Sequence, residues 1–281
     1  MSTPSMCKAG NLDALELVAA DGASATISLF GAHVLSWQTA DGRERLLLSG
    51  KAALDGSRPV RGGIPVIFPQ FSDQGAGQRH GFARTTVWQA EECGELEDGR
   101  QYVEMVLTPE LLPPALAAAW PCRLRYRVTI GGQEMQLMLQ VDNLGDKPLH
   151  FAAALHSYLR VLEVRDAVVH GLQGVRYTDS VSKQDGVEER SEFQLSDKYD
   201  RLYRHLLRPL ALETGQGRLH LTQSGFSDAA VWNPGPADCA ALPDMADDEW
   251  RDFICIEPAQ ISPVALPPGQ SWIGRHSLLV E

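Results

Sequence analysis

The stretch that decides the fold is Arg123-Leu124-Arg125-Tyr126-Arg127-Val128-Thr129-Ile130, followed by Gly131-Gly132 and by a second alternating run from Met135 to Val141. In the first run, apolar residues occupy every second position, and three arginines and a threonine lie between them. Because successive side chains of a strand point to opposite faces, each run is typical of a strand with one buried face. Two such runs around Gly-Gly predict a β-hairpin. The arginines are interpreted as a solvated strand face, with a binding patch as the alternative.

Short runs of the same kind recur along the whole chain and are separated by glycine, proline, aspartate and asparagine. They predict further strands at Leu15–Ala20, Ala25–Phe30, His33–Gln38, Thr86–Glu91, Tyr102–Thr108, Leu149–Leu155, Arg218–Gln223, Phe253–Ile256 and Trp272–Val280. Helical periodicity is confined to Pro114–Trp120 and Met245–Trp250, and Asp179–Arg190 is expected to be an exposed loop. Many short strands with turn signals indicate an all-β sandwich of antiparallel sheets.

The bulk composition sets limits on size, location and partners. A chain of 281 residues fits one large all-β domain over 1–281, with residues 1–10 expected as a flexible N-terminal segment. A net charge of -11 argues against nucleic-acid or anionic-membrane partners. Five scattered cysteines without a CxxC pair indicate a reducing, cytoplasmic setting. We find no signal-peptide run at the N-terminus and no apolar stretch that would span a membrane, and we expect a monomer rather than an oligomer.

A second informative stretch is RGGIPVIFPQF, from Arg61 to Phe71, followed by HGFAR, from His80 to Arg84. Three hydrogen-bonding side chains, Arg61, His80 and Arg84, are embedded here among glycines, prolines and bulky apolar residues. This mixture is typical of an anchored loop that holds polar groups rigidly. Two arginines near a histidine also suit an anionic small molecule despite the acidic chain, because guanidinium groups bind phosphate through paired bonds.

Four further residues are candidates for chemistry, each with a plainer alternative. His156 ends an apolar run and is equally typical of a core histidine. Glu257 follows the apolar run 253–256 and precedes a proline; burial of its carboxylate would require a partner, and a solvent-exposed strand end is the alternative. Asp200 lies between Lys198 and Arg201 and is otherwise a surface charge. Trp232 could stack on a sugar ring, but a core position is more common.

Several reaction classes lack their signatures. No P-loop and no GxGxxG follows a strand, so nucleotide hydrolysis and dinucleotide redox chemistry are not supported. A GxSxG nucleophile turn is missing as well. His80 and His156 are the candidates for a metal pair, but neither belongs to an HxH, HxxxH or HxxE arrangement. We therefore expect neither a cofactor nor a catalytic metal.

Read in order, these motifs resemble the glucose-6-phosphate 1-epimerase branch of the aldose 1-epimerase family, from about Asn11 to Val280. The resemblance rests on FGAHVLSW from Phe30, LLLS from Leu46, RGGIPVIFPQF, HGFAR, LHSYL around His156, YDRLY around Asp200, VWNP around Trp232 and CIEPA around Glu257. The number and order of these motifs along the chain make the resemblance specific.

The resemblance implies a β-supersandwich and interconversion of the α and β anomers of a hexose 6-phosphate, without metal or nucleotide. It implies His156 as general acid and Glu257 as general base. The substrate contacts that it implies are Arg61, Gln70, His80, Arg84, Asp200 and Trp232. We further expect the acid and the base to face each other across a gap that fits a pyranose, and nearby carboxylates to favour the charged histidine.

Three departures from the family pattern stand in this sequence. Ser72 follows Phe71 where glycine is usual, Arg79 precedes the HGFAR histidine where a small or neutral residue is common, and Gly235 follows Asn233-Pro234 in place of a bulky aromatic residue. Two rival functions stay open: a 1-epimerase for unphosphorylated aldoses, and a non-catalytic module that binds sugar phosphates. Either arginine of the loop is alternatively a structural partner of a core carboxylate.

Overall fold

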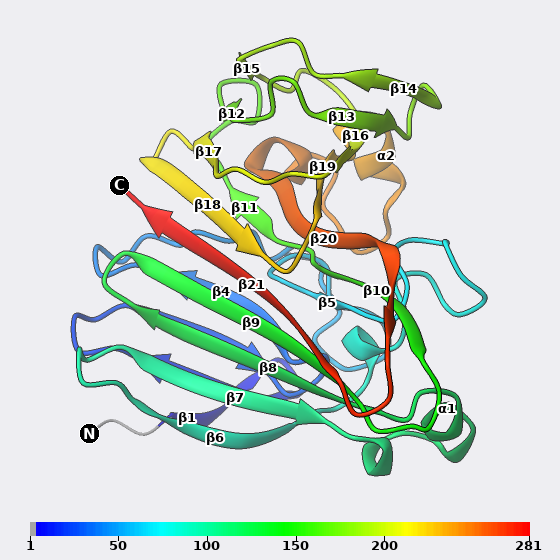
Figure 1. Ribbon diagram of the computed structural model, residues 1–281. Helices are drawn as coiled ribbons and strands as arrows, with labels where there is room; N and C mark the ends of the chain where they lie inside the picture. Colours follow the sequence, from blue (N-terminus) through cyan, green and yellow to red (C-terminus); the bar gives the residue numbers. More distant parts are fainter. Residues whose placement is uncertain (1–3) are drawn as a thin grey trace.

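The computed structural model describes residues 4–281, and all strand pairs within this range are antiparallel (Figure 1). The smallest sheet has the order β1 (Ser5–Ala9), β2 (Leu12–Val18), β3 (Ser24–Ser28) and β4 (His33–Gln38). An eight-stranded sheet has the order β14 (Gln184–Val187), β13 (Arg176–Asp179), β16 (Tyr199–Arg204), β19 (Asp228–Asn233), β20 (Phe253–Leu266), β10 (Leu149–Leu155) and β5 (Val66–Ile67), with β11 (Tyr158–Arg160) also paired to β20.

The third sheet has nine strands in the order β15 (Glu192–Phe193), β12 (Val168–His170), β17 (Leu210–Glu213), β18 (Arg218–Ser224), β21 (Ser271–Val280), β9 (Glu134–Asn143), β8 (Cys122–Gly131), β7 (Gln101–Leu107) and β6 (Gln89–Glu95). The helices are α1 (Pro114–Ala119) and α2 (Gly235–Ala241), with 3-10 turns at Ala83–Thr85, Pro109–Leu111 and Glu249–Asp252. Among the described residues, neither helix has the length and apolar character needed to cross a membrane.

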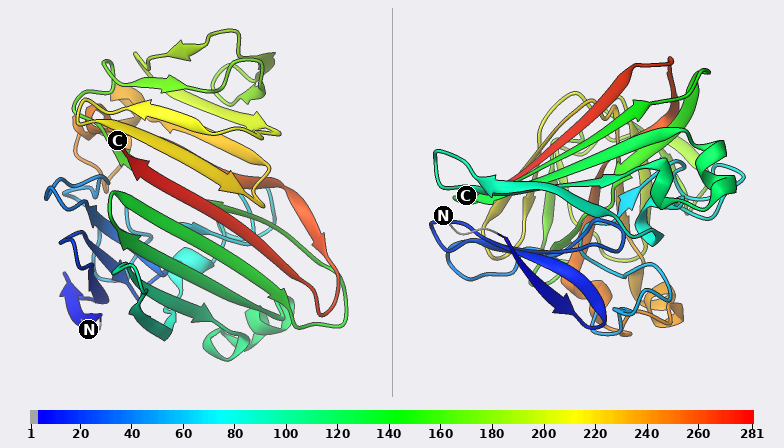
Figure 2. Two further views of the ribbon diagram at one scale, coloured as in Figure 1. Left: turned by 60° about the vertical axis from the view of Figure 1, so that its left-hand side comes forward. Right: turned by 90° about the horizontal axis from the view of Figure 1, so that it is seen from below.

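The predicted hairpin is confirmed as β8 and β9, which pair from Cys122↔Asn143 to Gly131↔Glu134. Its apolar side chains, among them Tyr126 and Val128, are fully buried and belong to the main core cluster, which also contains Trp37 of β4. The four-stranded sheet therefore packs against the nine-stranded sheet, as Figure 2 shows from below. This layered all-β architecture is the predicted sandwich.

The outward arginines of β8 find partners on their own face of the sheet. Arg125 donates to Asp142 at 3.0 Å, and the Arg127 guanidinium lies 3.8 Å from the centre of the Tyr102 ring. Arg123 pairs with Glu91. This pattern agrees with the interpretation of a polar strand face, because each guanidinium group contacts a carboxylate or an aromatic ring on that face.

Two segments have more structure than the sequence predicts. Within the segment 1–10, Ser5–Ala9 forms β1 and pairs with β2, while residues 1–3 lie outside the described residues. The expected loop Asp179–Arg190 contains a hairpin of β13 and β14. Beside this hairpin, the buried Glu188 accepts hydrogen bonds from Arg190, Arg201 and Tyr203. Both segments are edge structures, with exposed side chains or ionic partners in place of an alternating apolar pattern.

The helix predictions were correct in one case only. The expected helix at Pro114–Trp120 is confirmed as α1. The expected helix at Met245–Trp250 is wrong, because only the 3-10 turn Glu249–Asp252 forms there. The sequence also gave no helical signal for α2, which begins directly after Asn233-Pro234 with the asparagine side chain bonded to the Gly235 N–H.

Two fully buried histidines predict a loss of stability in acid. Burial lowers the pKa of His33 and of His276 to about 4 in each case. In the unfolded chain both titrate near pH 6.5. Below that pH the unfolded state binds more protons than the folded state, so unfolding becomes easier as pH falls towards 4. A pKa lowered by this much reduces the free energy of unfolding at pH 4 by about 3 kcal/mol for each histidine.

Denaturant unfolding at a series of pH values tests this linkage. His276→Gln should remove one histidine's share of the decline in unfolding free energy between pH 6.5 and 4. The matched variant His150→Gln changes an exposed histidine of β10 and should leave the decline unchanged. An identical decline in wild type and His276→Gln would show that His276 does not stay neutral in the folded protein.

Candidate active site

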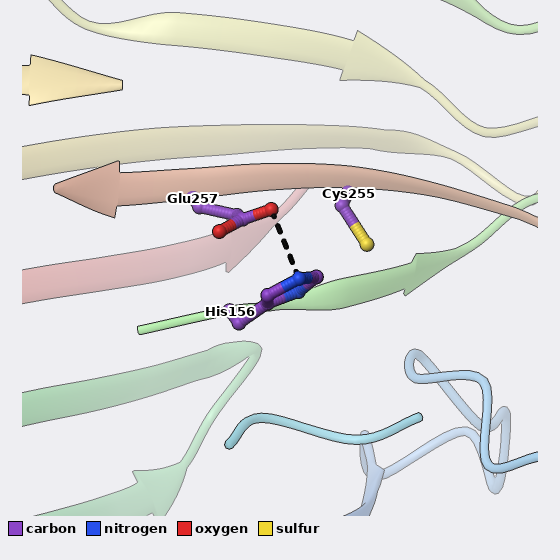
Figure 3. A group of neighbouring side chains, drawn as sticks. All are labelled: His156, Cys255 and Glu257. Carbon is purple, nitrogen blue, oxygen red and sulfur yellow. Dashed lines mark ion pairs between the residues drawn. The ribbon is translucent and has the colours of Figure 1, made fainter. Parts of the chain in front are cut away.

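His156 and Glu257 are brought together by strand register. β10 pairs with β20 at Ala154↔Ala259, and β11 pairs with the same strand at Tyr158↔Cys255. His156 lies between these two pairs and therefore opposite Glu257. The imidazole Nε2 is 3.4 Å from the carboxylate Oε1, and the two side chains are almost completely buried. A dashed line marks this contact in Figure 3. The expected pyranose-wide gap between them is wrong, because they are neighbours on one wall of the pocket.

The segments before and after β5 depend on glycine at close approaches of the backbone. Gly63 has φ +61°, and a Cβ there would lie 2.2 Å from the Val34 carbonyl oxygen. Gly81 has φ +72°, and a Cβ there would lie 2.0 Å from the Phe68 carbonyl oxygen. These clashes explain the glycines that follow Arg61 and His80. The glycines allow the two segments to pack directly on the strands, which holds both side chains at the pocket.

His80 has a fixed tautomer. Its Nδ1 accepts the N–H of Ser72 at 3.2 Å, and its own backbone N–H donates to the Ser72 carbonyl at 2.9 Å. Ser72 has φ +50°, so serine adopts here the left-handed conformation that glycine adopts more easily. Burial, followed by the charges of Arg84, Arg79 and Arg61, lowers the pKa of His80 to about 3. His80 is therefore neutral and carries its proton on Nε2, available for donation.

A pocket of about 530 Å³ opens beside these groups, within the range of about 300–1,000 Å³ typical of small-molecule sites. All predicted site residues except Gln70 line it: Arg61, His80, Arg84, His156, Asp200, Trp232 and Glu257. Another hollow of about 500 Å³ lies on the nine-stranded sheet, but its lining contains no carboxylate. Among the described residues, the pocket with the imidazole–carboxylate pair is thus the stronger candidate for acid–base chemistry.

Gln70 supports a loop and does not line the pocket. Its side-chain amide donates to the carbonyls of Ser72 and Gly77, and its Oε1 accepts the Gly77 N–H at 2.8 Å. The prediction of direct substrate contact by Gln70 therefore disagrees with its position. The motif match located the residue correctly but gave no information about the direction of its side chain.

The two loop arginines differ in their partners. Arg61 donates to both carboxylate oxygens of Asp244, at 3.1 and 3.3 Å, and to the Tyr158 hydroxyl at 3.1 Å. Arg84 donates to the Arg79 carbonyl at 2.8 Å, and its buried Nε has no hydrogen-bond partner within residues 4–281. Burial is the main cause that lowers the pKa of Arg84 to about 10, and the charge of Arg61 adds to it. Arg84 is thus a cation that lines the pocket without a paired carboxylate.

The environment of the acid–base pair favours its uncharged form. Burial, and secondarily the charge of Asp200, raises the pKa of Glu257 well above its usual range. Burial is the main cause that lowers the pKa of His156 well below its usual range, and the positive charges of Arg84 and Arg61 add to it. The expectation that carboxylates favour the charged histidine is therefore wrong for the protein's own surroundings of His156. Desolvation and the cations outweigh the one adjacent carboxylate.

Asp200 and Trp232 face each other across the β16–β19 pair and both line the pocket. The Trp232 ring meets the His156 ring edge-on, with 5.9 Å between centroids. Burial is the main cause that raises the pKa of Asp200 from its usual value. These two residues supply the polar and flat surfaces that a sugar ring requires.

Sequence reasoning missed two supporting residues. Tyr158 stacks on His156, with 4.9 Å between centroids and 13° between ring planes, and its hydroxyl accepts the bond from Arg61. Asp244 anchors the same arginine. Tyr158 lies in the quoted LHSYL motif, so its spacing of two residues from His156 was available as a signal. Asp244 is separated from its partner by 183 residues, and the sequence offers no comparable signal.

One group in the described residues could hold a metal ion: His156, Cys255 and Glu257, with candidate ligand atoms all within 4.8 Å of one another. This trio includes both members of the acid–base pair. A cation bound there would therefore occupy the groups that the pocket offers for proton transfer.

A model of the aldose 1-epimerase family matches residues 13–278 of the chain. A protein of Cenchrus ciliaris, named "Putative glucose-6-phosphate 1-epimerase", is 29% identical over 280 residues, which cover 95% of this chain and 84% of the relative. A protein of Escherichia coli with the same name is 30% identical over 89% of this chain and 85% of the relative.

Solved structures show the same architecture. The crystal structure of a protein from Salmonella typhimurium, described as a "putative mutarotase", superposes with a TM-score of 0.89 at 25% identity, covering 99% of this chain and 93% of the other. A galactose mutarotase-like protein from Clostridium acetobutylicum superposes with a TM-score of 0.73 at 16% identity, covering 99% of each chain. The fold is thus the galactose mutarotase-like β-supersandwich.

Proposed function

The chain belongs to the aldose 1-epimerase family, and from this premise we propose that it interconverts the α and β anomers of a hexose 6-phosphate, with glucose 6-phosphate as the first candidate. The observation that carries the proposal is Arg84, a cation without a carboxylate partner, in the same pocket as a buried imidazole–carboxylate pair. A phosphate group supplies the missing anion, and the pair supplies acid–base chemistry. The names of the relatives agree with this substrate.

Anomerisation requires two proton transfers at oxygens bonded to the same carbon. A base removes the proton of the anomeric hydroxyl while an acid protonates the ring oxygen, and the ring then opens to the aldehyde. Rotation about the C1–C2 bond exposes the other face, and closure reverses both transfers. The anomeric oxygen and the ring oxygen are both bonded to C1 and therefore lie close together. His156 and Glu257 lie side by side, with 3.4 Å between Nε2 and Oε1, which suits an acid and a base that must reach both oxygens.

In this proposal Glu257 is the base and His156 the acid, so the reactive pair is carboxylate and imidazolium. The protein's own groups disfavour that charge distribution, through burial and through the positive charges of Arg84 and Arg61. A bound phosphate dianion offsets those charges and thereby makes the imidazolium more favourable. The substrate's phosphate would thus support catalysis as well as binding, and proton transfer of this kind contributes about 10²–10⁴ in rate.

Two rival functions make different demands on the pocket. A 1-epimerase for free aldoses has no use for Arg84, a half-buried cation without a carboxylate partner within residues 4–281. A non-catalytic sugar-phosphate-binding module has no use for a buried His156–Glu257 pair, which costs desolvation energy. The proposed epimerase uses both features. Its small sugar-phosphate ligand and the five free cysteines also agree with a cytoplasmic enzyme, which forms part of the proposal.

Arg84→Ala should weaken recognition of the phosphate. A hydrogen bond to a charged group contributes about 1.5–3 kcal/mol, so we expect KM for glucose 6-phosphate to rise about tenfold to a hundredfold. Turnover of free glucose should change little. Steady-state kinetics with both sugars measures the difference, and Arg58→Ala, at an exposed position, is the control. Equal losses on the two sugars would assign Arg84 to structure or chemistry and contradict a phosphate contact.

Removal of metal ions should leave the exchange rate unchanged, because the proposed steps are proton transfers between the sugar, His156 and Glu257. The measurement is anomer exchange before and after dialysis against a strong chelator. Loss of activity that one specific cation restores would replace this mechanism with a metal-dependent one.

A further inference from the structure

Cys255 lies directly beside the acid–base pair, although the proposed anomerisation does not use it. Cys255 and Glu257 are two residues apart on β20, so their side chains point to the same face of the strand. Cys255 pairs with Tyr158 in β11, the strand that begins two residues after His156. In Figure 3 the sulfur, the carboxylate and the imidazole surround one common space.

Two of the three side chains carry buried polar atoms without a hydrogen-bond partner in the described part of the chain. Within residues 4–281, the buried atoms His156 Nδ1 and Glu257 Oε2 have no hydrogen-bond partner. Glu257 is 1% exposed and Cys255 is completely buried. Unpartnered polar atoms at such depth are uncommon in native proteins and call for a ligand or solvent to satisfy them.

The distance between the imidazole and the carboxylate fits a tetrahedral thiophilic cation. Zinc binds nitrogen, oxygen and sulfur at about 2.0–2.3 Å, which places ligand atoms about 3.3–3.6 Å apart at the tetrahedral angle. The imidazole Nε2 and the carboxylate Oε1, which are not the two unpartnered atoms, are 3.4 Å apart, and the candidate ligand atoms of the three residues all lie within 4.8 Å of one another. Zinc and cadmium accept a thiolate together with imidazole and carboxylate, whereas magnesium and calcium prefer an all-oxygen set.

We propose that His156, Cys255 and Glu257 form an inhibitory site for Zn²⁺ or a similar thiophilic divalent cation, with the fourth position open to the pocket. When the metal binds, the Cys255 thiol and the Glu257 carboxyl group each release a proton to solvent. The metal occupies the atoms that would transfer protons to and from the sugar. Metal and sugar phosphate therefore compete for the site, and a metal-free enzyme stays fully active.

Direct binding is tested without sugar, so that this result does not depend on the proposed function. Cd²⁺ is titrated into the protein, and the absorption of the thiolate–cadmium bond is recorded. In wild type the absorption band should reach its maximum when one Cd²⁺ ion is bound per protein chain. Cys255→Ala and Cys255→Ser should lose the band and weaken tight Cd²⁺ binding at least about tenfold. Cys239→Ala, at another buried cysteine, and Cys93→Ala, at an exposed one, should retain both.

Inhibition of anomer exchange by Zn²⁺ is the second measurement. It rests on the proposed function, whereas the Cd²⁺ titration does not. Zn²⁺ should slow anomer exchange in wild type, with relief by excess sugar phosphate, and each variant is compared with its own rate without zinc. Cys255→Ser should need at least about tenfold more Zn²⁺ for the same inhibition. An undiminished cadmium band or equal zinc sensitivity in the Cys255 variants would overturn the proposal. If neither variant folds, failure of sugar phosphate to displace Cd²⁺ from wild type would overturn it as well.

Discussion

Glu257→Gln should slow anomer exchange by about 10²–10⁴-fold, the range that positioned acid–base groups contribute. The amide has nearly the same volume as the carboxyl group, but it cannot accept the proton of the anomeric hydroxyl. Its burial beside His156 remains possible, because an uncharged amide costs less to desolvate than a carboxylate. The measurement is exchange on glucose 6-phosphate at saturating substrate, which reports turnover rather than affinity.

The matched control is Glu16→Gln, which changes an exposed glutamate of β2 and should leave exchange within about twofold of wild type. Thermal unfolding of both variants separates a catalytic defect from a folding defect. Near-wild-type exchange by a folded Glu257→Gln variant would show that Glu257 is not the base. Catalysis would then not explain why this carboxyl group is buried.

His156→Gln should reduce turnover by a similar factor, because no other side chain takes the same place beside Glu257. His80 lies close by, with 5.5 Å between the two ring centroids, but its Nδ1 is engaged by the N–H of Ser72. We expect kcat to fall by about 10²–10⁴ and KM to change by much less, since phosphate affinity resides in the arginines.

His150→Gln is the control, because this histidine belongs to the same strand, β10, and is exposed. A large rise in KM with unchanged kcat in His156→Gln would indicate a binding role for the imidazole. That outcome would contradict its assignment as the acid.

The fold was predictable where burial follows a period of two. The β8–β9 hairpin and β10 have alternating or continuous apolar residues, which the sequence displays directly. The β13–β14 hairpin was not predictable in this way, because the buried carboxylate of Glu188 and three polar partners hold it. Local pattern therefore identifies strands that bury apolar side chains and misses those that depend on ionic contacts.

The membership of the site was largely predictable from its motifs, but its geometry was not. His156 and Glu257 come from segments separated by about one hundred residues of sequence, and only the β10–β20 register makes them neighbours. Their charge state depends on burial and on the cations that surround them, which no single motif encodes. Likewise, the salt bridge that restrains Arg61 and the lack of one at Arg84 emerge only from the tertiary structure.

The central claim is that this pocket catalyses anomer exchange of a sugar phosphate, and magnetisation-transfer NMR tests it most directly. One anomeric proton of glucose 6-phosphate is saturated at equilibrium, and transfer to the other anomer is followed with and without protein. The account predicts faster transfer with wild type, much weaker acceleration of free glucose, and loss of the effect in Glu257→Gln. Transfer at the uncatalysed rate with folded wild-type protein would contradict the account.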